Sequence, residues 1–125
     1  MKKLLFVFLF MLSFRAFAQN VEVNGCTITL KYESLTEVFE AYGDVYVETN
    51  IKNTANVVVK IVDKPDDATY KVFKTTDTPK KCGEWRFVKE RNKAKFTVYF
   101  VKDGDFIEED FRICFINNRN DSGFY

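Results

Sequence analysis

The chain of 125 residues contains no histidine, one tryptophan and only two prolines. Histidine is the usual base that activates a serine or cysteine nucleophile, so its absence removes the common forms of nucleophilic catalysis. Histidine is also a frequent zinc ligand, and the three cysteines form no close pair that could hold zinc in its place. The five glycines lie in no phosphate-binding motif. We therefore expect no catalytic residue, no metal site and no cofactor.

Long apolar runs are also missing, and the longest one lies near the N-terminus. It extends from Leu4 to Leu12, follows two lysines, and is followed by Ala16-Phe17-Ala18. This order of features is typical of a secretory signal peptide. A membrane anchor needs about 18 or more apolar residues, and Arg15 interrupts the run earlier. We interpret residues 1–18 as a signal peptide and expect an exported protein, periplasmic or extracellular.

The charge of the remaining chain is close to balanced. Residues 1–18 include three basic residues and no acidic one, so the following 107 residues carry 16 basic and 18 acidic side chains. This balance does not favour binding to nucleic acid, and no membrane contact is expected after signal removal. A chain of this length fits one domain, and no Gly-rich or Pro-rich linker divides it.

All three cysteines, Cys26, Cys82 and Cys114, follow the signal peptide. In an oxidising compartment this odd number predicts one disulfide and one remaining thiol, and three pairings are open. Cys26 also ends the stretch VNGC, which loosely imitates a lipid-attachment box. A lipoprotein is therefore the alternative to simple export, although polar residues 19–24 separate Cys26 from the apolar run.

Residues 19–44 are expected to form an N-terminal extension made of a strand and a short helix. The stretch CTITLKY at residues 26–32 alternates and is rich in β-branched residues, which indicates a strand. The helix is predicted over residues 35–42, because Ser34 and Glu37 form a capping box and Gly43 can end it. Its apolar stripe would consist of Leu35, Val38, Phe39 and Tyr42.

Residues 45–125 alternate with period 2 and predict a mainly β domain. Units of a small residue, a strand and a polar turn recur about every 13 residues, which indicates an internal repeat whose copies pack on one another. Trp85 shares a face with Phe87, so we expect it in the core rather than in a ligand platform. The residues expected to have structural roles are Ala55, Ala68, Gly83, Trp85, Ala94 and Gly123.

The units ANVVVKI, AKFTVYF and EDFRICF, with the single GEW and the closing SGF, resemble the DUF6150 family, a bacterial family of unknown function. The resemblance covers residues 45–125 and implies a small β-rich domain whose backbone forms a deep torus knot. The family pattern has an Asp in each unit, whereas this chain has Asn56, Thr69 and Lys95 at such positions. The resemblance therefore does not imply a catalytic or metal-binding role for this position.

Two functions of different classes fit the sequence. The leading hypothesis is a non-enzymatic structural or protein-interaction module with an unknown protein partner, because no catalytic constellation is present. The alternative is a small hydrolase or carbohydrate-processing domain that uses turn carboxylates such as Asp103, Asp105 and Glu108. The two hypotheses differ in whether these carboxylates converge on one pocket or stay dispersed.

The first prediction concerns processing. Because Ala16-Phe17-Ala18 forms the cleavage site, the mature protein should begin at Gln19. The intact mass of material exported by an expressing bacterium tests this. A mass that still includes residues 1–18 would contradict the signal-peptide interpretation.

Overall fold

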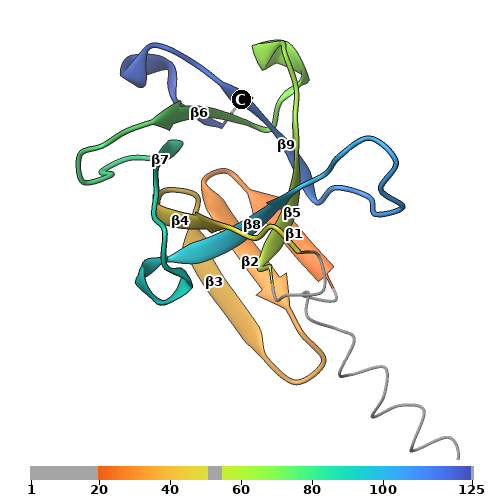
Figure 1. Ribbon diagram of the computed structural model, residues 1–125. Helices are drawn as coiled ribbons and strands as arrows, with labels where there is room; N and C mark the ends of the chain where they lie inside the picture. The colour runs from red at the N-terminus through yellow and green to blue at the C-terminus, as the bar shows by residue number, and fades with distance from the viewer. Residues whose placement is uncertain (1–19, 51–54, 125) are drawn as a thin grey trace, which may run out of the picture.

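A computed structural model describes residues 20–50 and 55–124, and the interpreted signal peptide lies outside these ranges. The N-terminal part forms an antiparallel three-stranded sheet (Figure 1). Its strands are β1 (Asn20–Asn24), β2 (Thr27–Lys31) and β3 (Thr36–Glu40). β2 lies in the middle and pairs with both neighbours.

The rest of the chain forms a closed parallel barrel of six strands, with three short 3-10 helices between strands. Around the barrel the order is β4-β8-β5-β9-β6-β7, and β7 pairs again with β4. A short final strand pairs antiparallel with β6. The elements are β4 (Gly43–Val47), β5 (Val57–Ile61), η1 (Pro65–Asp67), β6 (Tyr70–Lys74), β7 (Glu84–Phe87), η2 (Arg91–Lys93), β8 (Phe96–Phe100), β9 (Phe111–Phe115), η3 (Arg119–Asp121) and β10 (Gly123–Phe124).

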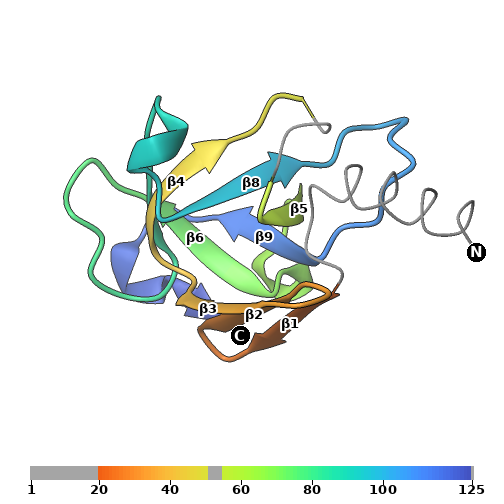
Figure 2. The ribbon, with the colours of Figure 1, turned by 90° about the horizontal axis from the view of Figure 1, so that it is seen from below.

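The chain passes around this barrel twice. The first circuit places β4, β5, β6 and β7, and the second places β8 between β4 and β5 and then β9 between β5 and β6. Successive strands are therefore mostly two positions apart, and later strands fill the gaps left by earlier ones. Figure 2 shows this interleaving, with β8 beside β4 and β9 beside β6.

Two connections lie on the outer side of the strands that they cross, because no residue of their 3-10 helices, η1 and η2, is buried. The β5–β6 connection contains η1, which contacts β9. The two ends of this connection continue the strand pairing on either side of β9, because Val62 N donates to Ile113 O and Thr69 N donates to Arg112 O. The β7–β8 connection contains η2 and crosses β4 in the same way. β9 is thus enclosed between the barrel interior and a connection made much earlier in the chain.

One barrel end is closed by the small sheet. Three aromatic residues near the starts of their strands contact it: Tyr70 donates to Gly25 O at 2.7 Å, Trp85 Nε1 donates to Ala41 O at 3.0 Å, and Phe96 stacks on Phe39 at 4.8 Å. All three are buried, and burial raises the pKa of Tyr70 to about 12. The small sheet and the barrel therefore share one core.

Three phenylalanines at strand ends close the other end of the barrel. Phe87, Phe100 and Phe115 are the last residues of β7, β8 and β9, and their ring centroids lie 6.3 to 6.4 Å apart. Each is only partly buried, so this aromatic trio separates the core from solvent.

A disulfide joins the two parts of the molecule. Cys26, in the turn between β1 and β2, is bonded to Cys82, which precedes β7, and their Cα atoms are 5.8 Å apart. Cys114 is a buried free cysteine. Of the three pairings that the sequence left open, the structure has this one.

The predicted helix over residues 35–42 is wrong. Residues 36–40 form β3, whose backbone pairs with β2 from Thr36–Lys31 to Glu40–Thr27. Phe39 of the supposed stripe packs inward, but Leu35 and Val38 are 66% and 63% exposed. A helix of eight residues is marginal in isolation, and pairing with β2 satisfies the same backbone groups.

The interpretation of a stacked repeat of about 13 residues is not supported. Strands β5 to β10 begin at residues 57, 70, 84, 96, 111 and 123, and most units lie beside copies that are distant in the chain. Ala68 and Ala94 do occupy equivalent places, each donating its N–H to the first residue of the preceding 3-10 helix at 3.1 Å. Of the six expected structural residues, only Ala94 is half-buried. The other five are buried: Ala55, Ala68, Gly83, Trp85 and Gly123.

Gly83 shows why one small residue is required. Its φ is +87°, and a Cβ there would collide with the backbone of β6 at Lys71 O and of β10 at Gly123 N. Gly104 has a similar φ of +91°, but a Cβ there would meet nothing within 4 Å. A side chain added at either glycine would therefore be strained by the positive φ, but only at Gly83 would it also collide with neighbouring backbone.

We predict that Gly83→Ala destabilises the protein far more than Gly104→Ala. Both variants should lose about 1–2 kcal/mol from the positive φ, and Gly83→Ala should lose roughly 1–3 kcal/mol more from overpacking. Urea titrations of the two variants measure the difference. Equal losses would mean that β10 does not lie against Gly83.

Candidate functional site

The described part of the molecule contains an open groove of about 360 Å³, which we call the Arg86 groove. Three segments that are distant in the sequence form it: the start of β4, the β6–β7 connection, and the region from β7 to the start of β8. Its lining is basic and partly apolar, and consists of Tyr42, Gly43, Asp44, Thr78, Pro79, Arg86, Lys93, Ala94 and Lys95.

An ion pair between neighbouring strands lines the groove. Asp44 and Arg86 are register partners in β4 and β7, and the guanidinium donates to both carboxylate oxygens at 2.6 and 3.0 Å. This hydrogen bonding lowers the pKa of Asp44 and raises that of Arg86. The bidentate geometry fixes both planar groups. The charge of Arg86 is therefore balanced within the protein.

Lys95 supplies a cation without a carboxylate partner among the described residues. Its ammonium lies 4.3 Å from the centroid of the Tyr42 ring, in cation–π geometry. Gly43 makes this possible, because a Cβ there would lie only 2.8 Å from Lys95 Cδ. Lys93 contacts Glu90 at 3.3 Å, but both side chains are more than half exposed, so solvent screens the pair. The groove thus has three cations and one carboxylate.

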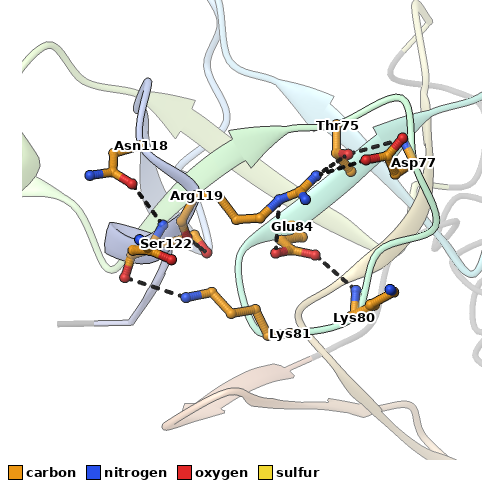
Figure 3. A network of polar contacts seen from close by, with 9 residues as sticks. Thr75, Asp77, Lys80, Lys81, Glu84, Asn118, Arg119 and Ser122 are labelled. Atoms are coloured by element: carbon orange, nitrogen blue, oxygen red, sulfur yellow. Dashed lines mark hydrogen bonds and ion pairs between the residues drawn. The ribbon is translucent and has the colours of Figure 1, made fainter.

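A second polar cluster lies around Arg119 (Figure 3). Glu84 is almost fully buried and accepts from Lys80 N at 2.9 Å, while Arg119 Nε lies 3.3 Å from its other oxygen. Arg119 also donates to Thr75 Oγ1 at 2.7 Å. These contacts join η3 to both ends of the β6–β7 connection. The charged and polar groups of this cluster pair with one another. Its role is therefore to hold the C-terminal segment in place.

The acidic residues proposed for hydrolysis lie on the β8–β9 connection and do not line the Arg86 groove. Asp105 accepts from the Tyr99 hydroxyl at 2.9 Å and from Lys102 N at 2.8 Å, and these hydrogen bonds lower its pKa. Asp103 and Glu108 are exposed on the same connection. Within residues 20–50 and 55–124, no group of three acidic or cysteine side chains is placed to hold a metal ion.

The sequence interpretation missed the Arg86 groove. Its residues come from separate segments that are brought together by the parallel pairing of β4 with β7 and β8. One sequence feature could have pointed to the groove: Lys95 stands where the resembled family pattern has an Asp. Ala94, expected to have only a structural role, also lines the groove.

A closed parallel barrel around which the chain passes twice follows the kind of path that a two-stranded torus knot requires. The sequence model of the 7(1) septoil knot domain family matches residues 39–124. This chain therefore belongs to the septoil knot domain family. The expectation of a knot-containing β family is confirmed, whereas the DUF6150 assignment stays a prediction.

No curated protein and no solved structure matches the chain. Within the part of the chain that the structure describes, no helix has the length and apolar character needed to cross a membrane.

The Asp44–Arg86 pair leads to a prediction about pH. The pKa of Asp44 in the folded state lies below its unfolded value of about 3.9. Its contribution to stability is therefore present above about pH 4 and is lost as the pH falls through the folded pKa. In Arg86→Gln, the pKa of Asp44 should rise toward its ordinary value, which carboxyl ¹³C NMR can follow. Lys93→Gln is the control and should leave that pKa nearly unchanged; an equal rise in both variants would contradict the assignment.

Proposed function

We propose that this protein is an exported, non-enzymatic protein-interaction module, and that the Arg86 groove binds an acidic segment of its partner. The observation that carries this proposal is the ammonium of Lys95, which is held over Tyr42 and has no carboxylate partner among the described residues. Tyr42, Pro79 and Ala94 add apolar and aromatic surface beside this charge. Such a combination suits recognition of a peptide that carries both carboxylates and an apolar side chain.

The frame around the groove supports this proposal. The Asp44–Arg86 pair fixes two lining side chains, and the parallel pairing of β4 with β7 and β8 holds the strands beside the groove. Binding to a preorganised surface loses less conformational entropy than binding to a mobile one. The Cys26–Cys82 disulfide is compatible with an oxidising, exported location.

The alternative, a hydrolase that uses Asp103, Asp105 and Glu108, has less support. The carboxylate of Asp105 accepts hydrogen bonds from the Tyr99 hydroxyl and from Lys102 N, which lower its pKa. A general acid needs a raised pKa, so Asp105 is poorly suited to protonate a leaving group near neutral pH.

A matched pair of charge reversals tests the proposal. Lys95→Glu places a negative charge in the groove, and Lys64→Glu makes the same change at an exposed position on the β5–β6 connection. The mature wild-type protein and both variants are immobilised and used to capture proteins from an envelope extract. We expect Lys95→Glu to reduce recovery of the captured partner at least tenfold, because like charges then oppose binding.

Lys64→Glu should capture as much partner as the wild type. A partner that is captured equally by all three proteins would exclude the groove as the binding surface. Capture of no protein by any of them would contradict recognition of another envelope protein.

A further inference from the structure

The β8–β9 connection carries an aromatic side chain that is fully exposed. Phe106 has a relative exposure of 106%, whereas the neighbouring Ile107 packs against the small cluster of Ala55, Val58 and Tyr99. On the other side, Asp105 is held by the Tyr99 hydroxyl and by Lys102 N. We call residues 102–110 the Phe106 loop. The loop is therefore anchored on both sides of Phe106 while this ring points into solvent.

The charge of the Phe106 loop is opposite to that of the Arg86 groove. The loop contains five carboxylates and one cation, and Asp103 and Glu108 are its two exposed carboxylates closest to Phe106. The groove contains three cations and one carboxylate. Its apolar lining and its volume of about 360 Å³ suit an aromatic side chain flanked by acids.

The groove and the loop lie at opposite ends of β8. Lys95 directly precedes Phe96, the first residue of that strand, and the loop begins two residues after Phe100, its last residue. Five residues of strand span about 16 Å. In Figures 1 and 2 the β7–β8 turn and the β8–β9 connection project from different sides of the barrel. The Phe106 loop of one molecule therefore cannot fill the groove of the same molecule.

We infer that the Phe106 loop of one copy docks in the Arg86 groove of a second copy, so that this chain associates head to tail. The inference rests on the proposed function, because it identifies the acidic segment that the groove binds. An interface between two different surfaces is heterologous, and repetition of it produces open chains or rings rather than a closed symmetric pair. A contact centred on one ring and a few charges is small, so the association should be weak and sensitive to salt.

Two variants that each remove one half of the contact test this inference. Phe106→Ser removes the ring from the loop, and Lys95→Glu reverses the charge in the groove; both residues are exposed, so the fold should be retained. Near-ultraviolet circular dichroism checks the fold. The weight-average mass of the mature protein is measured by sedimentation velocity at concentrations up to about 1 mM, the range of weak association, and at low and high salt.

We expect the mass of the wild type to rise with concentration and to fall back when salt is added. Each variant alone should stay monomeric, since it keeps only one half of the contact. An equimolar mixture should form 1:1 dimers and nothing longer, because only the loop of Lys95→Glu and the groove of Phe106→Ser are intact. Association of the wild type that both variants retain, or a mixture that does not assemble, would overturn the inference.

The outcomes also separate this inference from the proposed function. If the wild type stays monomeric to about 1 mM while capture of an envelope protein still depends on Lys95, self-docking is overturned and the proposed function stands. If Lys95→Glu changes neither capture nor self-association, both are overturned.

Discussion

Parallel pairing between strands that are distant in the chain is the constraint on which the rest of the structure depends. β9 has β5 on one side and β6 on the other, and the connection between these two strands crosses over it. Without β9, β5 and β6 would each lose a partner and the barrel would open. Pairing of strands that are distant in the chain costs loop-closure entropy. The contacts that offset this cost are complete only when the six-strand barrel is closed. Barrel closure, burial of the core and enclosure of β9 are therefore expected to form together.

The ends of the barrel are closed by different means. At one end the small sheet contacts Tyr70, Trp85 and Phe96, and the disulfide makes this contact covalent. Closing a loop with a sequence separation of 56 residues stabilises the folded state by about 4 kcal/mol in the chain-entropy model. At the other end only three partly buried phenylalanines separate the core from solvent. The small sheet is thus part of the barrel's core, although the family match begins only at residue 39.

Charged residues fall into two groups with different roles. The four arginines in the described ranges, Arg86, Arg91, Arg112 and Arg119, each form an ion pair with a carboxylate. Two of these carboxylates, Glu48 and Glu84, are buried, so loss of either arginine partner would leave a buried charge uncompensated and destabilise the fold. Lys95 instead keeps its charge at the surface, and Phe106 keeps its ring in solvent. The two groups that we propose for recognition therefore lie on connections, which can vary in sequence while the barrel keeps its internal pairs.

The sequence by itself determined the β character of the chain and the inward positions of most strands. Period-2 alternation places Tyr70, Trp85 and Phe96 in the core, because alternate side chains point to opposite faces of a strand.

The sequence did not determine which strands pair, because a strand has the same alternation whichever strands lie beside it. The residues from Leu35 to Tyr42 have helical spacing, yet pairing with β2 makes Thr36–Glu40 a strand. The cysteine pairing and the Arg86 groove were equally open in sequence. The disulfide depends on packing of the small sheet against the barrel, and the groove depends on segments that the barrel brings together. Only the tertiary structure decided them, since partner choice is a property of the closed barrel and not of any local segment.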